Sequence, residues 1–460
     1  MQPVQPLCSE QQTEQRDSVT GEHSFCAQYL YQMPWSDEDN AMAWLEVTRE
    51  CNLSCAYCCQ RHAAGSTKSL DTIRKEINIL MALRNCDTVI IAGGEPLLHP
   101  ELEQVVAMVK AKGKKPVLLT NGVRLTDRRL ADLVNAGLFG ITFHVDSRQQ
   151  RPGWEGCSEL ALNELREDLA LLAERHKLHC GFNTVVFPDT LGEVQQLARW
   201  AEYHSDKVHL MMFIAVRTSS DDDPWEYYVD GRRISIGKTA YASDAHEQSL
   251  TSHDLSDQIR CVFPGYRFNS FLGGTANSGV LKWAMGNHVC RDGKRLGNLG
   301  PASVRLLQRA AKKLVGRYVS HISPKISRNA WVTFLFALVD KHVRRTLWKH
   351  VSTAVTKPLK LLRKLNLQTF IVMQPMDFLP TGGQDHCKGC PNMTVYQGQL
   401  VRGCELESYL SHGGPFITVP KRLPNAYTGD FYRTTLLPPD PYAEEFIDAE
   451  PLETDEITGY

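Results

Sequence analysis

The sequence predicts an α/β fold in which a parallel sheet forms a partial (β/α)6 barrel or an open β/α sheet. Six short apolar stretches alternate with amphipathic stretches between residues 43 and 214. The intervals leave room for a right-handed crossover helix between successive strands. In such folds the chemistry gathers at the carboxyl ends of the strands, so the turns that follow these stretches are the candidate site.

Each element is expected from its local pattern. Ser69 is a plausible N-cap, and apolar residues follow it at helical spacing. Residues 88–92 are continuously apolar, which is typical of a strand buried on both faces. The expected strands are 43–47, 88–92, 116–119, 139–145, 180–187 and 207–214. Beyond the helix that starts after Ser69, the expected helices are 100–112, 126–135, 158–176 and 190–204.

Composition limits the class of protein. A chain of 460 residues is long enough for two or three domains, or for one barrel with additions, and 42% apolar with 22% charged residues is typical of a globular protein with a real core. The net charge of −1 gives no overall attraction for nucleic acid, so no DNA partner is expected. Fourteen Cys without a secretory signal indicate a reducing, cytoplasmic location and metal binding.

The domain organisation follows from shifts in composition. Residues 1–39 are polar and are expected to form a disordered lead-in. No run of 18 apolar residues exists, so no spanning helix is expected. The later segments are expected to be an α/β core at 40–216, an irregular, loop-rich covering segment at 217–300, a basic amphipathic helical segment at 301–370, a Cys-containing module at 371–435 and an acidic tail at 436–460.

Three cysteines follow the first expected strand at spacings of four and three residues: Cys51, Cys55 and Cys58. They can converge on one cluster if the chain loops tightly between them. Three thiolates satisfy three irons of a 4Fe–4S cluster and leave the fourth iron without a protein ligand. A structural zinc site is the alternative, and it needs a fourth ligand that His62 or Cys59 could supply.

A second motif, Gly93-Gly94-Glu95-Pro96, follows the second expected strand. Paired glycines let the backbone approach a ligand closely, Glu95 offers an acceptor for an ammonium group, and Pro96 stiffens the turn. On its own, such a tetrapeptide is an ordinary strand-to-helix turn.

Together the two motifs, C-x3-C-x2-C with Tyr57 before the last Cys and GGEP, resemble the signatures of the radical S-adenosylmethionine (SAM) superfamily. The resemblance covers about residues 40–215 and implies a radical SAM barrel. It implies a 4Fe–4S cluster whose open iron chelates the amino and carboxylate groups of SAM. One electron then cleaves SAM to methionine and a 5′-deoxyadenosyl radical, which abstracts hydrogen from substrate. An external one-electron reductant, of flavodoxin or ferredoxin type, is implied as a partner.

The resemblance also implies roles for single residues, although each could equally form a turn or core. The GGEP residues would line the pocket of the methionine amino group, and replacing Gly94 by Val is expected to weaken SAM binding with little loss of iron. Asn183 and Met212 stand where the family often faces its cofactor. The cofactor-binding candidates are Tyr57, Gly93, Gly94, Glu95, Pro96, Asn121, Asp146 and Ser147. No catalytic side chain is predicted.

The C-terminal half holds a second group of cysteines. Cys387 and Cys390 form a C-x2-C knuckle, and Cys404 follows. The segment loosely resembles the SPASM and twitch domains of the same superfamily, which implies a second 4Fe–4S cluster. The fourth ligand could be Cys261, Cys290 or His386. A zinc knuckle and unligated thiols remain open.

Residues 301–365 carry fifteen Lys and Arg against one acid, Asp340. An apolar run at 331–339 is too short to cross a bilayer, but a cationic amphipathic segment suits contact with the inner face of a membrane. It also suits an anionic substrate or an RNA backbone, and the ordinary explanation is a solvated helical subdomain. The expected substrate is a peptide or an amphiphilic or isoprenoid molecule. The competing class is a non-enzymatic iron–sulfur or zinc scaffold that binds a partner through this segment.

Overall fold

The computed structural model of the chain describes residues 25–421 except 56, 59–61, 218–223, 236–248, 322 and 380, and it does not describe the side chains of 354–356. Most of the expected lead-in, the whole acidic tail and Cys59 lie outside the described residues. The described residues up to Pro420 belong to one compact unit.

The six predicted strands form one parallel sheet, which confirms the α/β fold class. Their order in the sheet is the order in the chain, β2 to β7. Each strand is predominantly buried, because helices or covering segments lie on both faces. The strands are β2 (Met42–Glu46), β3 (Thr88–Ala92), β4 (Lys115–Thr120), β5 (Gly140–His144), β6 (His179–Val186) and β7 (Leu210–Ala215).

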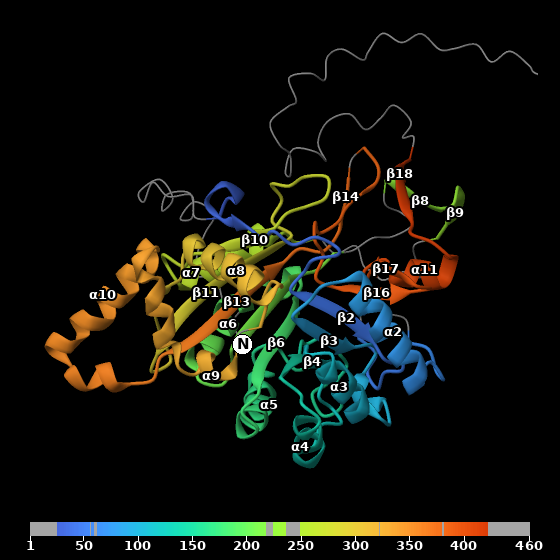
Figure 1. Ribbon diagram of the computed structural model, residues 1–460. Coiled ribbons are helices and arrows are strands. Elements are labelled where there is room, and N and C mark those ends of the chain that lie inside the picture. The colour runs from blue at the N-terminus through green and yellow to red at the C-terminus, as the bar shows by residue number, and fades with distance from the viewer. Residues whose placement is uncertain are drawn as a thin grey trace, which may run out of the picture. The chain divides into compact units, whose positions relative to one another are not determined.

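Five helices connect these strands. Ser69 and Thr126 cap two of them by accepting hydrogen bonds from the backbone N–H groups of Thr72 and Arg129. Figure 1 shows α3, α4 and α5 side by side along one side of the sheet. The helices are α2 (Leu70–Leu83), α3 (Leu102–Ala111), α4 (Asp127–Asn135), α5 (Asn163–Arg175) and α6 (Val194–Tyr203), with the 3-10 turns η2 (Pro96–Leu98) and η3 (Pro188–Glu193).

The sheet continues beyond β7 through strands that the sequence analysis does not predict. β13 (Asn366–Met373) pairs parallel to β7, and β11 (Trp283–Arg291) pairs antiparallel to β13. β10 (Ser270–Leu272), β1 (Tyr31–Gln32) and β12 (Lys294–Asn298) complete the sheet. Its path runs from β2 to β1 and does not close in the described residues, so the barrel is partial.

The remaining elements cover the sheet or extend from it. The helical ones are η1 (Ala27–Tyr29), α7 (Ser252–Val262), α8 (Pro301–Val315), α9 (Pro324–Ser327), η4 (Ala330–Leu338), α10 (Lys341–Thr356), η5 (Pro358–Leu362) and α11 (Leu406–His412). The strands outside the main sheet are β8 (Trp225–Val229), β9 (Arg232–Ile234), β14 (Asp377–Phe378), β15 (Gln384–Asp385), β16 (Met393–Tyr396), β17 (Gln399–Arg402) and β18 (Ile417–Pro420).

The two faces of the sheet have different neighbours. Alternate side chains such as Ile141, Phe182 and Phe213 pack with the apolar sides of the helices in the main core. The opposite face carries a row in register across five strands: His144, Asn183, Met212, Ile371 and Met285. This second face is the inner face of the partial barrel.

Candidate functional site

The loop that carries Cys51, Cys55 and Cys58 leaves the end of β2 and is closed at its base. The hydroxyl groups of Thr48 and Thr67 are 2.9 Å apart, and the Lys68 N–H donates to the Val47 carbonyl at 3.0 Å. The Arg49 N–H donates to the hydroxyl of Ser66 at 3.0 Å. The two ends of the loop, at residues 47–49 and 66–68, therefore lie side by side after β2. The three cysteines are held in the closed loop between them.

The two glycines of GGEP bring the end of β3 against this loop. The Gly94 N–H donates to the Thr48 carbonyl at 2.8 Å, and the Glu95 N–H donates to the Glu50 carbonyl at 2.7 Å. A Cβ atom on Gly93 or Gly94 would overlap the carbonyl oxygen of Thr48 or Glu50. Gly93 also has a φ of 144°, which disfavours other residues. The glycines are thus required for contact between two backbones, next to Cys51.

Glu95 is fully buried and joins the turn after β3 to the end of β4. Its carboxylate accepts hydrogen bonds from the Leu97 N–H at 2.9 Å, the Thr120 hydroxyl at 2.6 Å and the Asn121 N–H at 2.7 Å. Burial raises the pKa of this carboxyl, and these hydrogen bonds oppose the rise. Three of about four acceptor positions are therefore occupied by donors of this chain.

Asn121, at the end of β4, reaches the Cys loop. Its side-chain amide donates to the Oδ1 of Asn52 at 2.8 Å and lies 3.9 Å from the sulfur of Cys51. Its own Oδ1 accepts from the Val123 N–H at 2.9 Å, which fixes the amide orientation. Asn121 is therefore placed to hold the first cysteine of the triplet.

The three thiols are partly buried and share one electrostatic environment. Burial raises the pKa of Cys55, and Asp146, Cys58 and Cys51 raise it further, while Arg151 lowers it. Asp146, after β5, is itself fixed, because it accepts from the Arg148 N–H at 3.0 Å and pairs with His144 at 2.8 Å. A bound cation would deprotonate such thiols.

Arg151 is a site residue that sequence reasoning missed. It is 5% exposed, and it donates to the His144 carbonyl at 3.2 Å and to the Gln149 side chain at 3.0 Å. Burial lowers the pKa of Arg151, and the nearby Cys55, Asp146 and Glu95 counteract this effect. Its Nε atom is buried without a hydrogen-bond partner among the described residues. No motif predicts this residue, because its burial arises only in the folded chain.

Tyr57 and Ser147 occupy the edges of the site. The ring of Tyr57 packs on Phe187, which follows β6, at 4.7 Å between ring centroids. The Ser147 N–H donates to Glu159 at 2.7 Å, and Glu159 forms a fully buried ion pair with Arg166. This ion pair fixes the turn after β5. Glu159 lies in the stretch that the sequence predicts as the first turn of a longer helix. The structure begins that helix, α5, at Asn163.

The inner face of the sheet leads from this site to a cavity of about 110 Å³. In the row across the sheet, His144 and Asn183 stand nearest the Cys loop, and Ile371 and Met285 line the cavity. The Oδ1 of Asn183 is buried without a partner among the described residues. Most of the cavity wall is apolar, and the large side chains include Met33, Trp35, Met42, Trp283 and Phe336.

In the second group of cysteines, Cys387 and Cys390 are buried and Cys404 is partly buried. Cys387 and Cys390 form a thiol pair, and the hydrogen bond between them and burial raise the pKa of Cys387. Gly389, between them, has a φ of 64°, and a Cβ there would overlap the Trp35 carbonyl. The Arg84 guanidinium donates to the Cys390 carbonyl at 2.5 Å. The knuckle is therefore fixed on the chain that leads into β2.

Of the three candidates for a fourth ligand, the structure places His386 beside the knuckle. Its Nδ1 is 3.8 Å from the sulfur of Cys404, and its Nε2 is 3.3 Å from the carboxylate of Glu405. Cys290 is far from the knuckle. Lys282, which lowers the pKa of Cys387, directly precedes β11, and Cys290 lies eight residues further along, which is about 26 Å of strand. Cys261 lies in α7.

Neither group of cysteines has the geometry of a single-ion site. In the part of the chain that the structure describes, no three His, Cys, Asp or Glu side chains converge on one point that could hold a metal ion. Beside the first group, the exposed ring of His62 has its Nε2 3.9 Å from the sulfur of Cys58.

Part of the chain is similar to known proteins. Residues 45–201 match the model of the Radical SAM superfamily. The chain is 37% identical over 105 residues to a GTP 3′,8-cyclase of Chlorobaculum tepidum, covering 22% of this chain and 32% of that protein. It is 26% identical over 186 residues to a GTP 3′,8-cyclase of Stenotrophomonas maltophilia, covering 39% and 56%. The matched segments thus span between about a third and about half of these relatives.

A solved structure of Streptococcus suis SuiB bound to S-adenosylmethionine is similar at a TM-score of 0.35 and 13% identity. That match covers 55% of this chain and 51% of SuiB. None of the helices in the described residues is long and apolar enough to span a membrane.

Proposed function

Because residues 45–201 carry the domain of the Radical SAM superfamily, we propose that this chain is a radical SAM enzyme that binds a 4Fe–4S cluster through Cys51, Cys55 and Cys58. The carrying observation is the junction of the Cys loop with GGEP, where glycines at 93 and 94 are required for the backbones to meet. When bound, the cluster and SAM would supply a 5′-deoxyadenosyl radical that takes a hydrogen atom from the substrate, after one electron from an external flavodoxin-like or ferredoxin-like reductant.

The residues around the loop fit this pair of cofactors. Glu95 has one acceptor position left for the amino group of SAM, and the buried guanidinium of Arg151 can hold a carboxylate beside Cys55. The unpartnered Nε of Arg151 and Oδ1 of Asn183 offer a donor and an acceptor to a polar ligand. Asn121 keeps Cys51 in place from the carboxyl end of β4.

The substrate that we propose is an amphiphilic molecule with an apolar portion, such as an isoprenoid. The cavity lies on the sheet face that also carries Asn183, and its wall includes Met42, His179 and Leu210, the first residues of β2, β6 and β7. A substrate there would extend along this face toward the carboxyl ends of the strands to reach the SAM pocket. The cavity wall in the described residues includes Met33, Trp283 and Met285 but no Lys or Arg, so it offers no cation to a phosphate group. A GTP-like substrate is therefore disfavoured, although the relatives named above are GTP cyclases.

The buried knuckle is the proposed second metal centre. The centre would draw four donors from the three thiols and His386, which do not converge on one point in the described residues and would have to move together on metal binding. Glu405 holds the other ring nitrogen of His386, as carboxylates commonly do for metal-bound His. A four-ligand centre is closed and has no position for SAM. We propose a second 4Fe–4S cluster there, and a zinc ion in its place would make the module structural.

The proposal is tested by anaerobic reconstitution with iron and sulfide, followed by dithionite and SAM, with 5′-deoxyadenosine as the measured product. The wild type should form 5′-deoxyadenosine and hold about eight irons, whereas Cys51→Ala, Cys55→Ala and Cys58→Ala together should hold about four and form none. Reductive cleavage of SAM by that triple variant would show that the site is elsewhere. Binding of a partner without SAM cleavage by the wild type would favour the scaffold class.

A further inference from the structure

Exposed apolar side chains are concentrated in one short part of this chain. Nine of the 21 large apolar side chains that are exposed in the described residues lie between 330 and 364, in η4, α10 and η5. Leu335 is 71% exposed, Leu338 85%, Trp348 71% and Leu362 85%. We call residues 330–364 the outer segment. In Figure 1 its helix α10 projects from the end of the sheet.

One side of the outer segment packs on the rest of the protein, so its exposed apolar side chains do not contribute to that packing. Val343, Thr346 and His350 form the buried side of α10, and Ala330 and Thr333 anchor η4. The apolar members pack with Val289, Leu299 and Leu367 of the neighbouring strands and loops. The exposed Leu335, Leu338, Trp348 and Leu362 remain largely in contact with solvent, so this packing buries little of their apolar surface.

The charge of the exposed side is positive throughout. The one acid, Asp340, is buried and accepts hydrogen bonds from the N–H groups of Gly300 at 2.9 Å and His342 at 2.8 Å. In the described residues, no carboxylate lies within ion-pair distance of the eight cations of the outer segment. These cations are Lys341, Arg344, Arg345, Lys349, Lys357, Lys360, Arg363 and Lys364.

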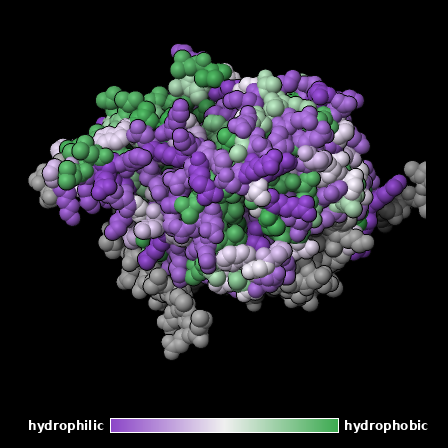
Figure 2. Space-filling model, turned by 90° about the horizontal axis from the view of Figure 1, so that it is seen from below, coloured by the Kyte–Doolittle hydropathy of each residue, from purple (hydrophilic) through white to green (hydrophobic). Residues whose placement is uncertain are grey.

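We propose that the outer segment is a docking surface for an anionic lipid bilayer. Cations beside exposed Leu and Trp match the headgroup region, where charge attracts anionic lipid and apolar side chains enter the acyl boundary. A second copy of the same surface would be repelled by its charge, and a nucleic-acid backbone would leave Leu335 and Leu338 in water. Figure 2 shows apolar and hydrophilic residues intermixed on the side where α10 lies.

The position of η4 gives the docking surface a second connection to the fold. Phe336, between the exposed Leu335 and Leu338, lines the cavity on the inner face of the sheet. Leu335 of the docking surface is thus the immediate neighbour in the chain of Phe336, which belongs to the cavity wall. The docking proposal itself stands on exposure and charge, and it does not depend on the radical chemistry.

The test is sedimentation of the full chain with vesicles of phosphatidylglycerol and phosphatidylcholine, compared with phosphatidylcholine alone. The wild type should bind the anionic vesicles, and binding should weaken with salt because screening is effective beyond about 8 Å at physiological ionic strength. Arg344→Glu, Arg345→Glu and Lys349→Glu together should weaken binding by about 100-fold or more. A matched control reverses Lys75, Lys110 and Lys112, which are exposed on α2 and α3.

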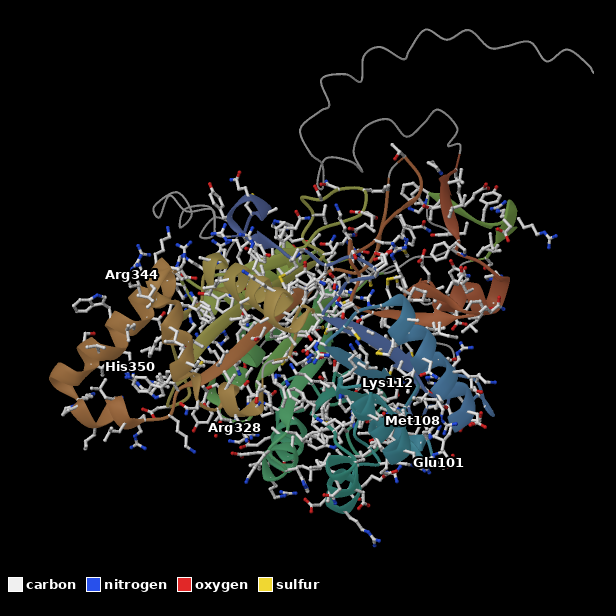
Figure 3. All side chains as sticks on the ribbon, viewed as in Figure 1. Glu101, Met108, Lys112, Arg328, Arg344 and His350 are labelled. Atoms are coloured by element: carbon white, nitrogen blue, oxygen red, sulfur yellow. The ribbon has the colours of Figure 1, made fainter. Side chains whose placement is uncertain are left out.

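Figure 3 shows why the control is informative, since Lys112 lies across the view from Arg344. The control changes net charge equally and should keep wild-type binding. Leu335→Ser with Leu338→Ser, which keeps every charge, should weaken binding by about tenfold or more. Circular dichroism checks that each variant is folded. Absence of wild-type binding at low salt, equal loss in both charge variants, or unchanged binding of the leucine variant would overturn the proposal, and so would preferential binding of RNA.

Discussion

The two groups of cysteines in this chain have similar ligands and opposite surroundings. Cys51, Cys55 and Cys58 are partly exposed on a loop, with the polar residues Asn121, Asp146 and Arg151 brought in from neighbouring strand ends. Cys387 and Cys390 are buried in a knuckle fixed on the backbone before β2. The thiols of the first group are partly open to solvent, whereas those of Cys387 and Cys390 are enclosed.

The histidine beside each group shows the same difference. His386 is buried, and Glu405 holds its second ring nitrogen. His62 is exposed near Cys58, and no carboxylate within the described ranges holds its ring. A fixed His is suited to be a permanent ligand, whereas an exposed one can move away. The surroundings, more than the spacing of the cysteines, therefore separate an open site from a closed one.

The largest effect is expected from Gly94→Val. The new side chain would overlap the Glu50 backbone next to Cys51, so the Cys loop must shift. We expect loss of about half the iron and a fall of at least about 100-fold in 5′-deoxyadenosine formation, since a misplacement of about 1 Å is enough for such a loss. This revises the sequence-based expectation that iron would be retained. The measurements are iron content and product yield after reconstitution.

The matched control is Gly389→Val in the knuckle. Its side chain would overlap the Trp35 carbonyl at a φ of 64°, so the damage should fall on the second centre. We expect iron loss with SAM affinity kept. Equal loss of SAM binding in both glycine variants would mean that the two regions are not independent.

A second pair of variants compares the two histidines. His386→Ala removes a donor beside Cys404 and should lose the second centre, leaving about four irons, with SAM cleavage retained. His62→Ala should change neither iron content nor product yield. A large loss of metal in His62→Ala, with zinc in the wild type, would instead support the closed zinc site at Cys51, Cys55 and Cys58.

A smaller effect is expected from Glu95→Gln. The amide oxygen of Gln can accept the hydrogen bonds of one carboxylate oxygen. Its NH₂ group would take the place of the other oxygen and would face a donor, either the Asn121 N–H or the Thr120 hydroxyl. An unsatisfied buried N–H costs about 1–3 kcal/mol, so we expect a lower unfolding temperature and roughly tenfold weaker SAM binding. Thermal unfolding without SAM separates the two effects. Unchanged stability would show that these hydrogen bonds are not required.

The strands of the core could be predicted from sequence because apolar runs such as residues 88–92 are buried on both faces, and the structure confirms them. β11 was not predictable, because Gly286, Asn287 and His288 interrupt its apolar pattern. β13 was missed although residues 370–373 are apolar, because the basic segment around it is expected from sequence to be helical. Likewise, sequence placed Asn121 and Asp146 at strand ends but gave no sign of Arg151. Its burial depends on how the turn after β5 folds over Cys55.

The comparison is tested most directly by electron paramagnetic resonance of reduced, reconstituted variants that each keep one group of cysteines. With Cys387, Cys390 and Cys404 replaced by Ala, the remaining cluster should give a signal that changes on addition of SAM, because its fourth iron has no protein ligand. With Cys51, Cys55 and Cys58 replaced by Ala, the remaining signal should not respond to SAM. A SAM response from the knuckle alone, or none from the loop alone, would contradict the assignment of the open site to the loop after β2.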